Sequence, residues 1–266
     1  MKLAILSGAG QLPVMIKQAH PDAHVVGFEG MPTELVDIAH LHRFERLGAL
    51  FSDLRDRGVS HIVMAGAMSR PDFSPDLLDD FTKSALPALM AVMAHGDDYL
   101  LRHLIALVEG QGFSVIGAHS LLPITQPAGV LAGQVPADVA RDIARADQVL
   151  KTLSPLDVGQ GVVVENGLVL GIETLQGTDA LLSFAAATAP NLRGPIGGVF
   201  VKRPKAGQDL RVDMPTIGPN TIDLVAQAGL SGIVISPDAC VVVDVHQTVE
   251  RANNHGIFII AAEATQ

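Results

Sequence analysis

The fold class of this 266-residue chain follows first from residues 2–10, KLAILSGAG, a short apolar run that ends in glycines. An apolar helical pattern over 12–19 and a second apolar run over 23–28 complete the opening of a βαβ unit. The alternation continues with a helical pattern over 48–57 and an apolar run over 61–65. A helix entered at Ser74 and Pro75 then runs to 93, a further helix covers 97–108, and an apolar run covers 113–117. We therefore predict an α/β protein whose N-terminal domain, residues 1–122, is a Rossmann-like parallel sheet.

The second half of the chain has a different pattern. Residues 123–136 carry prolines and small residues but no charge, which predicts a linker. Residues 161–172 are two apolar runs around Asn166-Gly167, the strongest short-range signal for a hairpin. Apolar runs over 196–202, 232–236, 240–244 and 256–261 alternate with helical patterns over 137–153, 221–228 and 245–253. This predicts a C-terminal mixed α/β domain, residues 137–266, that carries the main polar site.

Composition narrows the class of partner and the compartment. The formal net charge is -10 and no Lys/Arg-rich run is present, which argues against nucleic acid. The one cysteine, Cys240, lies in an apolar run and is expected in the core. With no internal disulfide, no cleavable leader and no apolar stretch of about 18 residues, we expect a cytoplasmic protein.

Three places in the N-terminal half are candidates for contact with a phosphate or ribose. The turn over Gly8, Gly10, Gln11 and Leu12 offers backbone amides and a helix N-terminus to an anion. Pro13 breaks the dinucleotide fingerprint, so a plain tight turn is the alternative. Ser69 and Arg70 follow the strand over 61–65, at the end of a parallel strand where ligands often bind. The alternative is that they form a solvated loop. Asp97 begins a helix. It either caps this helix or contacts a metal ion or a ribose.

The histidines give a weaker signal. His40 and His42 are two residues apart and could share a strand face, but no partner is near in sequence. We expect surface or core roles for them. The chain lacks Cys–His metal spacing, so a zinc site is not expected.

The strongest candidate is the polar run from Lys202 to Pro219. Asp209, Arg211 and Asp213 alternate with apolar residues, so an extended segment would place all three on one face. Two carboxylates that share a face favour Mg²⁺, which takes oxygen ligands. Lys202 and Arg211 could neutralise a phosphoryl group, and one carboxylate could orient water. The alternative is a solvated strand with ion pairs worth about 0–1 kcal/mol each.

Four motifs together resemble the LpxI family: residues 8–13 (GAGQLP), 96–98 (GDD), 177–179 (GTD) and 205–218 (KAGQDLRVDMPTIG). The last is long and specific, and Ala9 stands where the family usually has glycine. The resemblance implies a UDP-2,3-diacylglucosamine pyrophosphatase of lipid A biosynthesis in Gram-negative bacteria. In this family water attacks the α-phosphorus, with Mg²⁺, and the products are UMP and 2,3-diacylglucosamine 1-phosphate (lipid X). It further implies peripheral contact with membrane lipid at the inner face of the inner membrane. We also expect a homodimer.

Site roles follow from combining this resemblance with the residue chemistry. We predict Asp213, Asp209 and Asp223 as catalytic residues, and Asp209, Asp213, Asp179 and Glu173 as ligands of Mg²⁺. The residues predicted to bind substrate are Gly8, Gly10, Gln11, Leu12, Ser69, Arg70, Asp97, Thr178, Lys202, Lys205, Gln208, Arg211 and Thr216. Two other readings stay open: a nicotinamide-dependent oxidoreductase, resting on Gly8, Gly10 and Glu29, and a non-catalytic lipid-binding protein.

Overall fold

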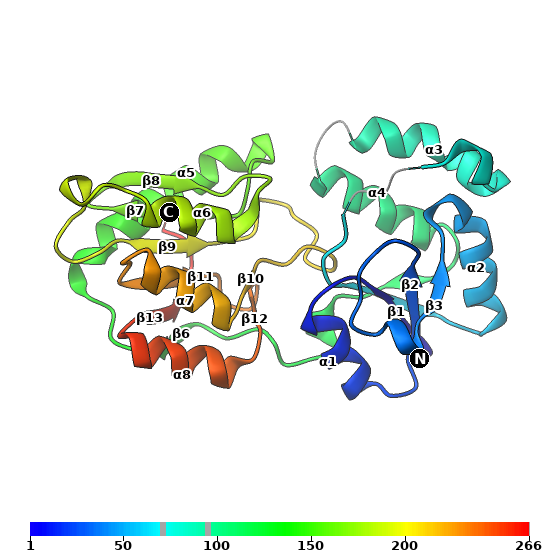
Figure 1. Ribbon diagram of the computed structural model, residues 1–266, viewed down its shortest axis with the longest axis horizontal. Coiled ribbons are helices and arrows are strands. Elements are labelled where there is room, and N and C mark those ends of the chain that lie inside the picture. Colours follow the sequence, from blue (N-terminus) through cyan, green and yellow to red (C-terminus); the bar gives the residue numbers. More distant parts are fainter. Residues whose placement is uncertain (70–72, 94–96, 266) are drawn as a thin grey trace. The chain divides into compact units, whose positions relative to one another are not determined.

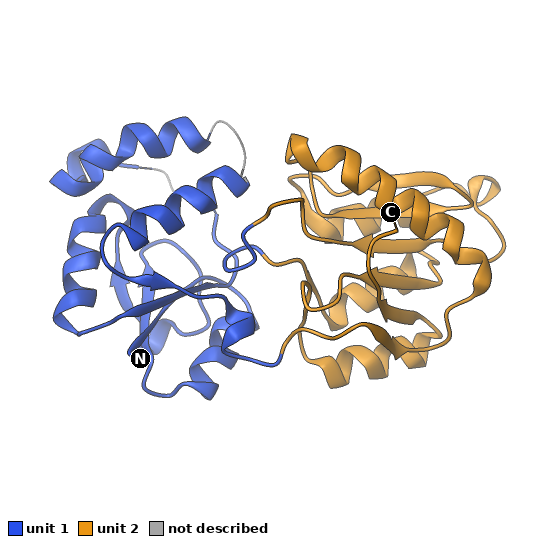
Figure 2. Ribbon diagram, turned by 180° about the vertical axis from the view of Figure 1, so that it is seen from behind, with its two compact units in different colours: residues 1–123, 209–213 blue, residues 124–208, 214–266 orange. Residues whose placement is uncertain are grey.

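The computed structural model (Figure 1) describes residues 1–69, 73–93 and 97–265. The chain divides into two compact units (Figure 2). Unit 1 consists of residues 1–123 and 209–213, and unit 2 consists of residues 124–208 and 214–266. The short segment 209–213 therefore belongs to a different unit from the residues on either side of it.

Unit 1 is built on a five-stranded sheet in the order β3-β2-β1-β4-β5, and every pairing in it is parallel. The strands are β1 (Leu3–Ser7), β2 (His24–Phe28), β3 (His40–His42), β4 (His61–Ala65) and β5 (Ser114–Val115). This strand order is that of doubly wound α/β sheets, which confirms the predicted parallel sheet. The chain leaves β1 and β4 toward opposite edges, so the loops after these two strands meet at the switch point of the sheet.

Four helices accompany this sheet: α1 (Gln11–Ala19), α2 (Leu47–Asp56), α3 (Asp80–Met93) and α4 (Asp97–Glu109). Leu54, Leu89 and Ile105 from three of them pack with the strands in one core. The prediction that α3 begins at Ser74 and Pro75 is wrong, because Ser74 precedes and Pro75 begins a separate single turn, Pro75–Leu77. Asp79 caps α3 instead, and its Oδ1 accepts the Thr82 amide at 2.7 Å.

Unit 2 contains a mixed six-stranded sheet in the order β6-β13-β11-β9-β7-β8. The strands β9, β11 and β13 pair in parallel, and the other pairings are antiparallel. The bounds are β6 (Gly129–Ala132), β7 (Gly161–Glu165), β8 (Leu168–Ile172), β9 (Val199–Lys202), β11 (Gly232–Ile235) and β13 (Phe258–Ala261). A second, two-stranded sheet pairs β10 (Thr216–Ile217) with β12 (Val241–Val242). The predicted mixed α/β unit is therefore confirmed.

The two faces of this larger sheet have separate cores. Helix α5 (Ala140–Leu153) packs against Val199 and Val201 on one face. Helices α6 (Gly177–Ala186), α7 (Pro219–Gln227) and α8 (Val245–His255) share a core with Phe200 on the other face (Figure 1). Cys240 is fully buried in that second core, as predicted, and burial raises the pKa of its thiol to about 12.

Two local predictions in unit 2 had different outcomes. Asn166 and Gly167 both adopt positive φ, 51° and 76°, and join β7 to β8 as the hairpin signal predicted. Residues 123–136, expected as a linker, contain β6, which pairs antiparallel with β13. This edge strand is short and rich in small residues, so its sequence carries little strand signal.

None of the helices among the described residues is long and apolar enough to cross a bilayer.

Candidate active site

Residues 209–213 form a turn, so the prediction of an extended strand with three side chains on one face is wrong. The Val212 amide donates to the Asp209 carbonyl at 3.4 Å. The Asp209 carboxylate accepts the Arg211 amide at 3.0 Å. A carboxylate that bonds the backbone two residues ahead is the mechanism by which aspartate initiates turns. Local hydrogen bonds thus replace the strand that the alternating pattern suggested.

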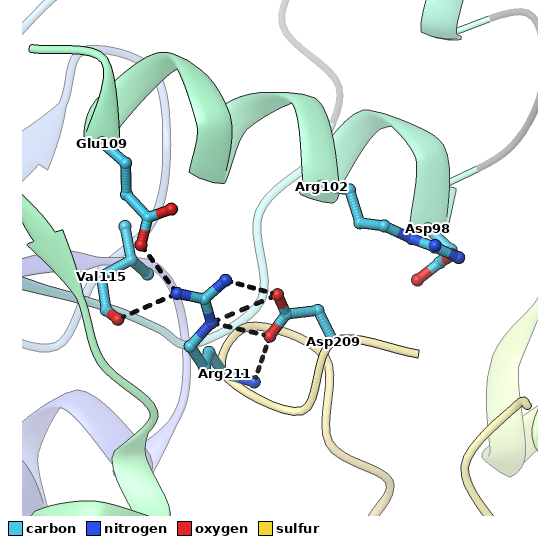
Figure 3. Close-up of polar contacts among 6 residues, drawn as sticks. All are labelled: Asp98, Arg102, Glu109, Val115, Asp209 and Arg211. Atoms are coloured by element: carbon cyan, nitrogen blue, oxygen red, sulfur yellow. Dashed lines mark hydrogen bonds and ion pairs between the residues drawn. The ribbon is translucent and has the colours of Figure 1, made fainter. Parts of the chain in front are cut away.

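Arg211 fixes this turn to unit 1 (Figure 3). Its Nη2 lies 2.7 Å from Asp209 Oδ2, and its Nη1 donates to Glu109 Oε1 at 2.7 Å and to the Val115 carbonyl at 3.4 Å. Val212 packs against the core of the same unit. The turn is therefore anchored both by charge and by apolar contact.

The charges of this group stabilise one another. The hydrogen bond from the Arg211 guanidinium holds the pKa of Asp209 below its usual range, although burial opposes the effect. The same bond raises the pKa of Arg211 above its already high value. The positive charge of Arg102 on α4 also lowers the pKa of Asp209, and Arg102 Nε bonds Asp98 at 2.8 Å. Asp209 is thus a carboxylate at neutral pH with both oxygens held by Arg211.

The N-terminal glycine turn lies at the switch point of the unit 1 sheet. Ala9 and Ala67 exchange backbone hydrogen bonds of 2.9 Å, which join the loops after β1 and β4. A Cβ on Gly8 would lie 2.4 Å from the Ala67 carbonyl oxygen, so glycine is needed for this approach. Gly10, at φ 103°, donates its amide to Glu34 Oε2 at 2.7 Å. The amide predicted to meet a phosphate is thus bound by a carboxylate of the chain itself.

The other predicted residues of unit 1 lie around the same loops. Gln11 and Leu12 are the first two residues of α1, and Asp97 is the first residue of α4. The Ser69 hydroxyl lies 3.3 Å from the Met31 sulfur. Arg70 lies outside the described residues.

Three predicted residues of unit 2 form one buried cluster. Lys202 ends β9, Glu173 follows β8, and Thr178 lies in the first turn of α6. The Lys202 ammonium donates to the Thr178 hydroxyl and lies 3.5 Å from Glu173 Oε1, which accepts the Thr178 hydroxyl at 2.9 Å. Glu173 Oε2 is buried and has no hydrogen-bond partner in the described part of the chain. A Cβ on Gly161 would lie 2.5 Å from this oxygen, so glycine provides its space.

Two helix N-termini meet beside this cluster. Asn220 at the start of α7 donates to Asp179 Oδ2 in the first turn of α6 at 3.1 Å. The positive ends of two helix dipoles, the Lys202 ammonium and the carboxylates of Glu173 and Asp179 therefore gather at this edge of unit 2.

The remaining predicted residues do not join the cluster. Lys205 pairs with Asp157, and its amide donates to Gln208 Oε1 at 2.8 Å. The Thr216 hydroxyl donates to the Met214 carbonyl at 3.0 Å. Asp223 pairs with Arg251 and lies 3.5 Å from His255, so it faces α8 and not the polar run as expected.

A buried ion pair was missed at the sequence level. Arg203, directly after β9, donates to Asp147 Oδ1 of α5 at 2.5 Å, and both residues are about 5% exposed or less. Arg203 also donates to the Ala262 carbonyl at 2.6 Å, and Asp147 accepts the Thr265 amide at 2.7 Å. One signal could have found it: Asp147 lies between Ala146 and Leu150 on the apolar stripe of α5.

The predicted metal ligands are divided between the units. Glu173 and Asp179 belong to unit 2, while Asp209 and Asp213 belong to unit 1. Each pair offers only oxygen ligands, which suits Mg²⁺, an ion that commonly uses one or two carboxylates and substrate phosphates. The unpartnered Oε2 of Glu173 is the oxygen that fits such an ion best.

The fold and the polar clusters define a class: a two-unit α/β protein whose unit 2 carries an ammonium, two carboxylates and two helix N-termini at one edge. Residues 2–125 match the model of the LpxI N-terminal domain and residues 127–260 match that of the LpxI C-terminal domain. The chain therefore belongs to the LpxI family. It is 36% identical to the UDP-2,3-diacylglucosamine pyrophosphatase LpxI of Caulobacter vibrioides, over 98% of each chain.

Proposed function

We infer that this protein is a hydrolase that cleaves the diphosphate of UDP-2,3-diacylglucosamine. The observation that carries this conclusion is the match to a UDP-2,3-diacylglucosamine pyrophosphatase over 98% of both chains. Both halves of the chain match the corresponding family domains, so the likeness is not confined to a shared nucleotide fold. Neither the oxidoreductase nor the lipid-carrier alternative has comparable support.

We propose that water attacks the α-phosphorus, so that UMP and lipid X are released. A diphosphate carries negative charge that grows on the leaving group, and fixed cations and helix dipoles lower the cost of that charge. Lys202, Thr178 and the first turns of α6 and α7 are assigned to this role in unit 2. In unit 1, Arg211 is proposed to bind a phosphate of the substrate.

The proposed roles of the carboxylates are to orient the attacking water and to bind Mg²⁺. We propose Asp213, Asp209 and Asp223 as catalytic candidates. Asp213 ranks first, because Arg211 holds both oxygens of Asp209 and because Arg251 and His255 hold the carboxylate of Asp223. Glu173 and Asp179 are the proposed ligands of Mg²⁺ in unit 2. When bound, Mg²⁺ would supply positive charge that neutralises the diphosphate oxygens.

Contact with lipid is proposed to be peripheral. Leu175, Phe184 and Leu192 are large apolar residues with exposed fractions of 85%, 65% and 65%, all within residues 175–192 around α6. Two acyl chains gain about 0.8 kcal/mol per buried CH₂, so apolar surface of this kind suits contact with lipid. We propose that this contact is made at the inner face of the inner membrane. A homodimer is proposed as well, and sedimentation equilibrium would test it.

The function is tested by release of UMP from UDP-2,3-diacylglucosamine, with Mg²⁺ and with a chelator. We expect release by the unmodified protein with Mg²⁺, and a loss in kcat of about 10²- to 10⁴-fold in Asp213→Asn. Asp138→Asn, an exposed aspartate outside both clusters, is the matched control and keeps full activity. No UMP from the unmodified protein would overturn the function. Full activity in Asp213→Asn would overturn only the site assignment.

A further inference from the structure

Three histidines and an aspartate meet on one face of unit 1, and none of them belongs to the groups assigned above. His24 begins β2, and His40 and His42 are the two ends of β3. In the parallel register Val26 lies opposite His40, and Phe28 lies opposite His42. Alternate residues of a strand share a face, so His24 lies on the same face as Val26 and Phe28.

This face is the one that α2 covers. Val26 and Phe28 share a core with Leu50 and Leu54 of α2. The last turn of α2 contributes Asp53, and Arg57 follows directly after the helix. In Figure 1, β2, β3 and α2 lie side by side. Residues distant in sequence are thereby brought to one spot, which supplies the partner that His40 and His42 lack in their own stretch of sequence.

The distances in this cluster are somewhat longer than those between ligands of one metal ion. His24 Nε2 lies 3.6 Å from Asp53 Oδ2, and one ligand atom each of His24, His40 and Asp53 lie within 4.8 Å of one another. Two ligands at about 2.0–2.1 Å from a tetrahedral ion are roughly 3.3–3.5 Å apart. Only small side-chain shifts separate the observed arrangement from coordination.

One ligand atom is left without a hydrogen-bond partner. His24 Nε2 is buried and accepts or donates no hydrogen bond in the described part of the chain. Buried polar atoms are almost always bonded, so an orphaned imidazole nitrogen beside a carboxylate points to a ligand. We propose that His24, His40 and Asp53 form a binding site for a divalent transition-metal ion of the zinc class. Two imidazoles and one carboxylate favour such an ion over Mg²⁺.

Arg57 is the competitor for this site. Its Nε lies 2.9 Å from Asp53 Oδ1, and its Nη2 lies 3.1 Å from His40 Nδ1. The Arg57 side chain is 35% exposed, so it can turn toward solvent when an ion enters. His42 Nε2 contacts Asp53 Oδ2 at 3.4 Å from outside the three-residue group, and is assigned to holding the carboxylate. Loss of the Arg57 charge should therefore strengthen metal binding, whereas loss of a ligand should weaken it.

The test is calorimetric titration of tag-free, chelator-treated full-length protein with Zn²⁺, and with Co²⁺ followed by visible absorption. We expect one ion per chain, affinity lowered at least about 10-fold in His40→Ala and in Asp53→Asn, and affinity raised by up to about 10-fold in Arg57→Gln. His246→Ala, an exposed histidine on α8, is the control and should bind as the unmodified protein does.

His40 is exposed, so its substitution should leave the core intact, and circular dichroism checks this. If Asp53→Asn unfolds, His40→Ala and Arg57→Gln still decide the question. No Zn²⁺ binding by the unmodified protein, or unchanged affinity in a folded His40→Ala, would overturn the proposal.

Discussion

Arg211 Nη1 donates to Glu109 Oε1 at 2.7 Å, and this contact fixes residues 209–213 to unit 1 although their neighbours on both sides belong to unit 2. The most specific motif of the family is thus shared between the two units. Residues 205–208 and 214–218 lie in unit 2, and the central Asp209–Asp213 lies in unit 1.

Loss of the Arg211 side chain should release this turn. Arg211→Ala removes the bonds to Asp209, Glu109 and Val115 together, so we expect faster amide exchange over 209–213 and a fall of about 1 kcal/mol in unfolding free energy. Hydrogen exchange with mass spectrometry measures the first, and urea unfolding the second. Glu109→Gln, which removes one anchor only, should show a smaller effect. Equal exchange in all three proteins would contradict the anchoring role.

Lys202 should have a structural and a catalytic contribution that can be separated. Lys202→Met leaves Glu173 as an unpaired buried carboxylate, so we expect a loss of stability of about 3–5 kcal/mol. The double variant Lys202→Met/Glu173→Gln removes the buried charge as well and should regain most of that stability. Its kcat should stay about 10²- to 10³-fold below that of Glu173→Gln, the control that also lacks the proposed Mg²⁺ ligand but keeps the ammonium, because Lys202 stabilises developing charge. Recovery of activity together with stability would limit Lys202 to a structural role.

The buried pair of Arg203 and Asp147 should matter far more for stability than the exposed pair of Arg251 and Asp223. Asp147→Ala strands a buried guanidinium and frees the Thr265 amide, so we expect a loss of about 3–5 kcal/mol. Asp223→Ala breaks a partly exposed pair and should cost about 0–1 kcal/mol. Urea unfolding of both variants gives the comparison. Similar losses of unfolding free energy in the two variants would show that burial does not determine how much an ion pair stabilises this protein.

The cap of α3 should make part of the stability depend on pH. Burial alone would raise the pKa of Asp79, but hydrogen bonds from Thr82 and Ala49 outweigh it and lower the pKa below its ordinary value. In the unfolded chain the carboxyl therefore binds protons more readily than in the folded protein. Its stabilisation is present above the unfolded pKa and is lost as pH falls through the folded pKa.

Asp79→Asn tests this dependence. Unfolding free energies between pH 2 and 7 should converge for the variant and the unmodified protein at the acidic end. At neutral pH the variant should be less stable by about 0.3–1 kcal/mol, because asparagine still caps the helix but lacks the negative charge that the helix N-terminus favours. A constant difference across the whole range would contradict a titrating cap.

Local patterns predicted much of the fold, because its strands and helices carry strong apolar periodicity. The hairpin was predictable to the residue, since Asn166 and Gly167 tolerate the positive φ that the turn requires. Strand β6 was not, because a short edge strand of small residues has a weak signal. The polar run was identified as important but given the wrong conformation. Alternation suggested a strand, whereas bonds from Arg211 and burial of Val212 in unit 1 favour a turn.

The sites depended on contacts that no local pattern records. Glu173, Thr178 and Lys202 were each singled out from sequence, and the structure brings them together. Glu34 on the Gly10 amide and Asp53 beside His24 come from distant segments, so only the folded chain reveals them. Asp223 was expected near the polar run because it follows the helix entrance, but the helical turn directs it to α8.

The central claim is hydrolysis of UDP-2,3-diacylglucosamine by attack of water at the α-phosphorus. The most direct measurement is one turnover in ¹⁸O-water, with both products analysed by mass spectrometry. We predict that UMP carries one ¹⁸O atom and that 2,3-diacylglucosamine 1-phosphate carries none. Label in the lipid product alone would place the attack at the other phosphorus, and unlabelled, uncleaved substrate would contradict the hydrolase itself.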